Sequence, residues 1–368
     1  MEIKRAAEVQ RCFVVNQEVL EILVKAPTLA LLFAIFSLSL VASSILVPLL
    51  RKVALRYSIV DRPNQPHKTH QETIPYLGGF AIIFPVSLLA IIGPVIFIES
   101  AEYKIRTLLI LAPAIIMSIV GLYDDIKSLS AQSRFILQTV MAIVVTIYLK
   151  QLGFTVLVTD SNLLNFLLSM LWLVGITNAF NFFDNLDGGA AGITVISSLT
   201  LAVLSYVGEQ YLIASFSLTL AGAGLGFLWW NRSPARIYLG DSGALFIGLM
   251  LSVALLQFEP NVDSRFASAL LPVFILALPI IDTSVVVASR ISRGVSIFQG
   301  GRDHLSHRLL EAGFSRRVTA TLLWVMGGFF SILSLLISAV SKEIGFTMSL
   351  VGLAIMGFLF VKFLKRNI

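Results

Sequence analysis

The stretch that decides the fold is "SNLLNFLLSMLWLVGITNAFNFFDNLDGG", residues 161–189. Its first part, residues 161–183, has no formal charge and is long enough at 1.5 Å per residue to cross ~30 Å of hydrocarbon. Its last twelve residues hold three Asn, two Asp and two Gly. We therefore predict a transmembrane helix that carries polar side chains to one surface of the membrane.

Ten further runs without formal charge occur in the 368-residue chain. Hydrophobic residues make up 57% of the sequence and charged residues 13%, whereas soluble domains have roughly one-quarter charged residues. The mean hydropathy is +0.89. The ten runs are residues 29–50, 77–98, 107–123, 135–149, 188–208, 210–231, 242–258, 266–281, 318–341 and 344–361. We predict an all-α, polytopic integral membrane protein with about eleven transmembrane helices.

The chain is expected to form one membrane domain. Residues 1–26 are polar, mixed in charge and without the apolar region of a signal peptide, so we interpret them as a tail or surface helix. Residues 27–368 contain no internal repeat and form the membrane-embedded domain. The single cysteine, Cys12, gives no disulfide framework.

The distribution of Lys and Arg predicts the orientation. When the loop at residues 51–76 is placed inside, the inner segments hold 18 of the 27 Lys and Arg residues. The N-terminus is then outside and the C-terminus is cytoplasmic. Basic loops beside anionic lipid also account for the net charge of +6, so no nucleic-acid partner is implied.

Polar residues are concentrated at the predicted cytoplasmic ends of the spans. A carboxylate at membrane depth costs ~2.5–3.5 kcal/mol on insertion scales, so a group of them indicates partners or a metal. Four spans contribute to this group, and its members are Asp124, Asp125, Asn178, Asn181, Asp184, Asp187, Asp241 and Asp282. Hard oxygen ligands of this kind favour Mg²⁺, or Mn²⁺, over zinc.

Each member also has a simpler interpretation. Asp124 and Asp125 could end a helix beside Lys127 and Arg134, and the "DNLDGG" segment could be only a turn.

Asn178 and Asn181 could make hydrogen bonds between helices. Asp241 or Ser242 of "GDSG" could be a helix N-cap, and Asp282 could pair with Arg290 two helical turns on.

Basic loops on the same side supply the other half of a phosphate site. The first loop, "VDRPNQPHKTHQETIPYLGG", carries Lys68 and His70. The last one contains "QGGRDH", whose glycines allow close approach to an anion, and arginines fit phosphate oxygens in a bidentate way. Its basic residues are Arg290, Arg293, Arg302, His304, His307, Arg308, Arg316 and Arg317. Acids, a cation site and a basic loop at the membrane surface predict phosphoryl transfer involving a membrane-resident substrate.

Five motifs resemble a known family. In order, "HKTHQETIPYLGG", "GLYDDIKSL", "NAFNFFDNLDGG", "NRSPARIYLGDSG" and "GRDHLSHRLLEAGFS" are similar to those of the polyprenyl-phosphate N-acetylhexosamine-1-phosphate transferases, glycosyltransferase family 4. The likeness covers roughly residues 45–317 and implies eleven spans, typical of the branch that uses GlcNAc 1-phosphate. The sister branch, the phospho-MurNAc-pentapeptide translocase, usually has ten spans and three consecutive histidines where this chain has "HLSHRLL".

The resemblance implies a role for each residue that matches a motif. Asp241 is the expected metal ligand, with Asn181 reaching the metal in some members. Catalytic roles are implied for Asp124, Asp125, Asp184, Asp187, His304 and His307. Substrate-binding roles are expected for Lys68, His70, Asn178, Asn181, Asn231, Tyr238, Arg290 and Arg302, with Asn231 and Tyr238 at the uracil base. Ser306 departs from the family, because many relatives have His there, and Asn185 stands where the translocases usually have Gly.

We therefore expect a Mg²⁺-dependent enzyme of the inner (plasma) membrane with its active site on cytoplasmic loops. It transfers N-acetylhexosamine 1-phosphate, as GlcNAc 1-phosphate, from a UDP-sugar to polyprenyl (undecaprenyl) phosphate and releases UMP. The expected partners are UDP-N-acetylhexosamine, the lipid acceptor, the bilayer and a second copy in a homodimer. The alternatives are the translocase, a secondary transporter and a non-catalytic scaffold.

Overall fold

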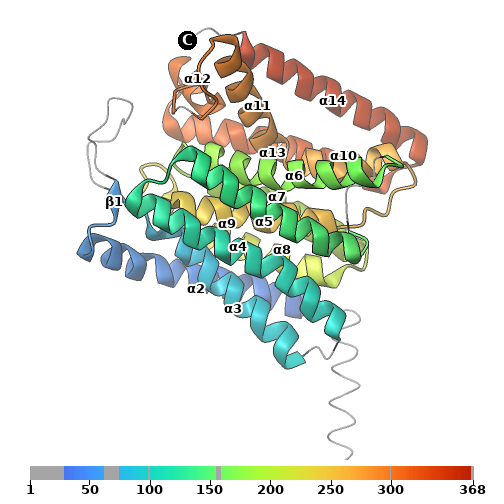
Figure 1. The fold of residues 1–368 in the computed structure, drawn as a ribbon, viewed down its shortest axis with the longest axis horizontal. Helices are drawn as coiled ribbons and strands as arrows, with labels where there is room; N and C mark the ends of the chain where they lie inside the picture. The colour runs from blue at the N-terminus through green and yellow to red at the C-terminus, as the bar shows by residue number, and fades with distance from the viewer. Residues whose placement is uncertain (1–28, 62–73, 98–99, 155–158, 299, 366–368) are drawn as a thin grey trace, which may run out of the picture.

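The computed structural model describes residues 29–61, 74–97, 100–154, 159–298 and 300–365 (Figure 1). The predicted tail at residues 1–26, and Lys68 and His70 of the first loop, lie outside the described residues. The described part is almost entirely helical, so the all-α class is confirmed. A short antiparallel pair, β1 (Val60–Asp61) and β2 (Ile74–Pro75), joins the two ends of the first loop.

Every charge-free run falls on a helix or a helix pair. The elements are α2 (Leu29–Arg56), η1 (Leu77–Gly79), α3 (Phe80–Phe97), α4 (Ala101–Lys127), α5 (Ala131–Gln151), α6 (Asn162–Phe183), α7 (Gly189–Val207), α8 (Tyr211–Asn231), α9 (Gly240–Gln257), α10 (Arg265–Ile275), α11 (Ala277–Ser292), α12 (Leu305–Glu311), α13 (Arg316–Ala339) and α14 (Lys342–Leu364).

Within the described ranges, nine helices are long and apolar enough to cross a membrane. The pair α10 and α11 also qualifies but is bent by 77°, and Leu77–Ile92 forms a shorter apolar helix. A polytopic membrane protein is therefore confirmed, whereas eleven spans and their orientation remain predictions.

Local sequence explains where the helices begin and where one breaks. Ser130, Ser161, Ser264 and Ser315 each accept a backbone N–H three residues on, which caps α5, α6, α10 and α13. The bend between α10 and α11 falls at Leu276, because Pro279 has no N–H to donate to the carbonyl four residues earlier.

Helix α9 is the centre of the molecule and positions the acids. Most of its side chains are buried, and α4 and α6 pack along it. Gly121 of α4 lies so close to α9 that a Cβ there would be 2.5 Å from the carbonyl oxygen of Asp241. This close approach brings the end of α4, with its two aspartates, beside the first turn of α9.

The helix ends that carry the motifs are joined by backbone hydrogen bonds. Tyr238 N donates to Pro75 O at 2.8 Å, and Gly78 N donates to Tyr238 O at 3.0 Å. These bonds connect β2 and η1 with the α8–α9 loop. The spans lie side by side in Figure 1, with β1 and α12 toward the same side of the view. The motif loops therefore meet at one end of the helix bundle.

Candidate active site

Asp241 lies where three other helix ends converge. Asn181 of α6 donates its amide N–H to Asp241 Oδ1 at 2.8 Å. The guanidinium of Arg134, in the first turn of α5, is 3.0 Å from Asp241 Oδ2 and 2.6 Å from Asp124 Oδ2. Two carboxylates, from α4 and α9, thus share one arginine, and an amide from α6 bonds to one of them.

Asp125 points at the start of α9. Its carboxylate oxygens accept the backbone N–H groups of Asp241 at 3.0 Å and Ser242 at 3.4 Å. The N-cap interpretation of "GDSG" was therefore wrong about the acceptor, which comes from α4 and not from Asp241 or Ser242. Gly240 has φ +75°, and a Cβ there would be 2.8 Å from Asp125 Oδ2, so this turn requires glycine.

The "DNLDGG" segment is held against the α8–α9 loop. Asn231 accepts Gly188 N–H at 3.0 Å and donates to Ile237 O at 2.9 Å, so both ends of its buried amide bond to backbone. Asp187 accepts Ala235 N–H at 3.2 Å and lies 3.6 Å from the guanidinium of Arg316.

Asp184 is the residue that ends α6. Burial raises the pKa of Asp184 to about 8, and the nearby carboxylates of Asp241 and Asp187 add to the effect. A carboxyl that keeps its proton near neutral pH can donate a hydrogen bond to an anionic ligand.

The last loop is ordered by charged pairs. Asp282, inside α11, accepts from His304 Nδ1 at 2.7 Å and from Leu305 N–H at 2.7 Å. Arg290 instead donates to Asp303 at 3.1 Å, so the suggested Asp282–Arg290 pair was wrong. The carboxylate of Asp282 thereby fixes the ring of His304.

Three other residues of the last loop lie in different environments: one bonds to the "DNLDGG" segment, one is largely buried and one is exposed. Ser306 donates to the side chain of Asn185. Burial, followed by the neighbouring His304 and Arg302, lowers the pKa of His307 to about 4, so His307 is neutral at pH 7. Arg302 is exposed.

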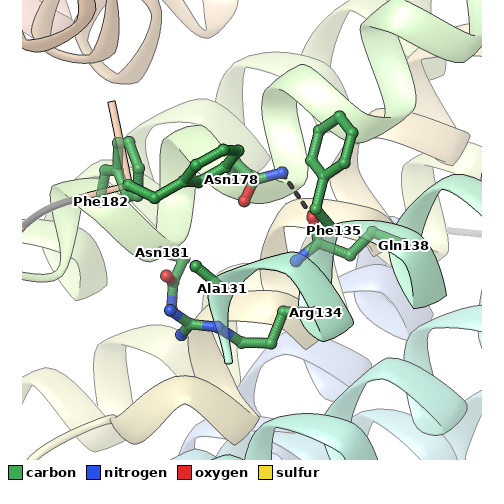
Figure 2. A pocket seen from close by; sticks show the side chains of 8 residues that line it. Ala131, Arg134, Phe135, Gln138, Asn178, Asn181 and Phe182 are labelled. Carbon is green, nitrogen blue, oxygen red and sulfur yellow. Dashed lines mark hydrogen bonds between the residues drawn. The ribbon is translucent and has the colours of Figure 1, made fainter. Parts of the chain in front are cut away.

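A pocket opens between α5 and α6 beside Arg134 (Figure 2). Asn178 donates to Gln138 of α5, so its predicted interhelical hydrogen bond is confirmed. Phe298 from the last loop makes an edge-to-face contact with Phe135, with ring centroids 5.9 Å apart. The lining residues are Ala131, Arg134, Phe135, Gln138, Asn178, Asn181, Phe182 and Phe298.

Sequence reasoning missed the parts played by Arg134 and Gln138. Arg134 was considered only as a neutralising charge, and Gln138 was not singled out. Their spacing of four residues places them on one face of α5, and such a polar pair at the start of an apolar helix was the available signal.

Known proteins are similar to this chain over most of its length. It is 35% identical to a probable undecaprenyl-phosphate N-acetylglucosaminyl 1-phosphate transferase of Bacillus subtilis, across 83% of this chain and 84% of that protein. Residues 107–259 match the model of glycosyl transferase family 4. The chain belongs to glycosyl transferase family 4.

Two further family 4 relatives represent different branches. A decaprenyl-phosphate N-acetylglucosaminephosphotransferase of Mycolicibacterium smegmatis is 31% identical across 76% of this chain and 75% of its own. A phospho-N-acetylmuramoyl-pentapeptide-transferase of Oceanobacillus iheyensis is 29% identical across 82% of this chain and 95% of its own. The resemblance drawn from the five motifs is confirmed at family level.

The acids around Asp241 are the candidate metal ligands of this family 4 protein. No group of three or more His, Cys, Asp or Glu side chains has metal-binding geometry in the part of the chain that the structure describes. The carboxylates of Asp124 and Asp241 nevertheless share one cation, the Arg134 guanidinium, and the amide N–H of Asn181 is bonded to Asp241, so oxygen-bearing side chains from three helices lie together. This donor set fits Mg²⁺ better than a thiophilic metal.

Proposed function

We propose that this protein transfers N-acetylglucosamine 1-phosphate from UDP-GlcNAc to polyprenyl phosphate and releases UMP. The observation that carries the proposal is that Asp124 and Asp241 share Arg134, and Asn181 bonds to Asp241, beside a pocket at the end of the helix bundle. The names of the Bacillus and Mycolicibacterium relatives support the same acceptor and sugar.

The reaction is a direct displacement at phosphorus. An oxygen of the acceptor phosphate attacks the β-phosphorus of UDP-GlcNAc, and the bond from this phosphorus to the bridging oxygen of the diphosphate breaks. UMP leaves with that oxygen and the bonding electrons. Asp241, with Asn181 and Asp124, would hold a Mg²⁺ ion, which would neutralise charge on the diphosphate.

The contacts of Asp125 and Asp124 favour this route over a phospho-enzyme. Asp125 accepts two backbone N–H groups from α9, and Asp124 accepts Leu129 N–H at 2.6 Å while its other oxygen lies against Arg134. A carboxylate whose oxygens are already bonded is a poor nucleophile. These acids instead position α9 and Arg134.

Arg134 has the position of an acceptor-phosphate ligand. It lines the pocket between α5 and α6, whose other walls include the aromatic rings of Phe135, Phe182 and Phe298 (Figure 2). A guanidinium at the base of an aromatic pocket suits a phosphate attached to an apolar chain. In the proposed orientation this pocket lies at the cytoplasmic surface of the plasma membrane.

We place the other predicted site residues at the UDP-sugar donor. Asp184, Asp187 and Tyr238 lie around the "DNLDGG" turn, where we place uridine and sugar. His304, oriented by Asp282, and the exposed Arg302 are placed at the diphosphate. A homodimer also remains a proposal.

The test is UMP release by the purified protein given UDP-GlcNAc, undecaprenyl phosphate and Mg²⁺, with chelator as the control. Arg134→Ala should lower kcat/KM for the lipid by roughly tenfold to 10²-fold, the effect of one lost hydrogen bond to a charged group. Lys127→Ala, an exposed cation at the end of α4, is the matched control. No UMP release from UDP-GlcNAc would overturn the proposal.

Two alternatives give different results in this assay. A phospho-MurNAc-pentapeptide transferase would release UMP only from UDP-MurNAc-pentapeptide. With either donor, Arg302→Ala should lower the rate of UMP release. A transporter would release none. The bent span α10–α11 is a feature that transporters share, but the acids of this chain gather at one end of the bundle instead of the midplane.

A further inference from the structure

A second cavity lies on the side of α8, and it shares no residue with the pocket beside Arg134. We call it the lateral groove. Its volume is about 410 Å³, within the range of small-molecule sites. Its lining residues are Leu40 and Ser44 of α2, Leu225, Gly226, Leu228 and Trp229 of α8, Arg232, and Trp324 of α13.

Glycines create the groove. A Cβ at Gly226 of α8 would collide with the carbonyl oxygen of Leu40, so α2 packs directly on the backbone of α8. On the other side, the Trp324 ring lies over Gly192 and its indole N–H donates to Gly188 O at 3.1 Å. Helices α2 and α13 are thereby held against α8 and α7, and the space between them is walled mainly by apolar side chains.

The end of the groove that meets the motif loops is cationic. The guanidinium carbon of Arg232 lies 3.8 Å from the centroid of the Trp229 ring, and this ring is 60% exposed. Arg317 donates to Ser233 O at 2.9 Å, next to Arg232 in the chain. Both arginines are exposed, and neither has a carboxylate partner among the described residues.

The surrounding acids do not cancel this charge. Asp187, which lies under the same loop, is buried and bonds to Ala235 N–H and to Arg316. The groove therefore combines apolar walls, an aromatic residue of the kind that marks the membrane interface, and one lining arginine, Arg232, with the exposed Arg317 bonded to the next residue of the chain. Basic pockets of this kind between helices suit anionic lipid headgroups.

We propose that the lateral groove binds an anionic diacyl phospholipid from the surrounding bilayer. An acyl chain lies between α2, α8 and α13, and the phosphate lies against Arg232 and Arg317. The site is separate from the acceptor pocket, so the proposal stands independently of the transferase reaction. Charge complementarity selects this occupant over a neutral lipid.

The test uses the full chain in mixed micelles with brominated lipids, which quench tryptophan fluorescence on contact. Brominated phosphatidylglycerol should quench at an about fivefold lower mole fraction than brominated phosphatidylcholine, the effect of one arginine beside an anionic headgroup. Arg232→Gln should remove this preference, and Arg232→Lys should keep it. Arg56→Gln, an exposed arginine at the end of α2, should keep it too.

A second variant tests whether an acyl chain occupies the apolar part of the lateral groove. Ser44→Phe fills the groove from α2 and should reduce quenching by phosphatidylglycerol without removing the cation. Equal quenching by both lipids in the wild type, or an unchanged preference in Arg232→Gln, would overturn the proposal.

Other possible occupants of the lateral groove would give different results in the quenching experiment. If phosphatidylglycerol quenches preferentially only after residues 1–28 are deleted, the groove holds the chain's own N-terminal segment. If the preference appears only in monomers after dimers are separated, a second copy covers it. Either result would overturn lipid binding in the intact protein.

Discussion

The carboxylate of Asp125 accepts the backbone N–H of Asp241 at 3.0 Å, so the acid that ends α4 caps the helix that carries the expected metal ligand. Adjacent acids in the "DD" motif thus have different structural roles. Asp124 faces Arg134, whereas Asp125 holds the first turn of α9.

Asp125→Ala should destabilise the protein by about 1 kcal/mol, the usual cost of losing an N-cap acceptor. Asp125→Asn keeps one carbonyl oxygen and should lose less. Thermal unfolding of the purified protein measures both, with Asp263→Ala, at an exposed site outside the cluster, as the control. An Asp125→Ala protein as stable as wild type would show that the cap is dispensable.

Asp241→Ala should reduce turnover by on the order of 10²-fold or more, because one carboxylate carries much of the charge neutralisation at the diphosphate. Insertion and thermal stability should change little. UMP release over a Mg²⁺ titration measures the effect. Near-normal turnover would contradict the assignment of Asp241 as the metal ligand.

Tyr238→Ala should raise the KM for UDP-GlcNAc by roughly tenfold if the ring stacks on uracil, since such stacking contributes ~1–3 kcal/mol. The Tyr238 ring lies 6.2 Å from that of Tyr76 and is half-buried, and burial with the nearby Asp187 raises its pKa. The KM for the lipid should stay unchanged. Tyr57→Ala is the exposed control, and a shift in the lipid KM alone would contradict the placement.

His307 should stay neutral down to about pH 4, because burial and the neighbouring His304 and Arg302 lower its pKa to about 4. Between pH 6.5 and pH 4, His307 binds a proton in the unfolded chain but not in the folded protein. Stability should therefore fall between about pH 6.5 and pH 4 and be unaffected above this range. Carbon-13 NMR of the histidine rings, assigned with His307→Gln, checks the pKa; a midpoint near 6.5 would contradict it.

The helices could be predicted because their signals are local. Each charge-free run coincides with a helix or the bent pair, and the four capping serines lie directly before α5, α6, α10 and α13. The gathering of acids at one end followed from the alternation of span direction. Asp124, Asn181 and Asp241 do meet there.

The pairings inside the site could not be predicted because they depend on packing between helices. Asp282 and Arg290 are two turns apart on α11, which suggested a pair, but the last loop folds back and supplies His304 and Asp303 instead. Asp125 reaches the start of α9 only because Gly121 lets α4 approach closely. A single sequence contains no signal for that distance.

The buried Arg308 connects the last loop to the end of the last helix. Its guanidinium donates to Asp303 O at 2.9 Å, within the loop, and to Phe363 O at 2.7 Å, in the final turn of α14. The N–H of Lys365 at the helix end is also directed at Phe363 O, so the arginine is a second donor to this carbonyl. During synthesis the residues around 304 emerge well before residue 363. The loop therefore gains this hydrogen bond only after α14, whose acceptor lies 55 residues beyond Arg308, has been translated, so the order of the last loop depends on a helix made after it.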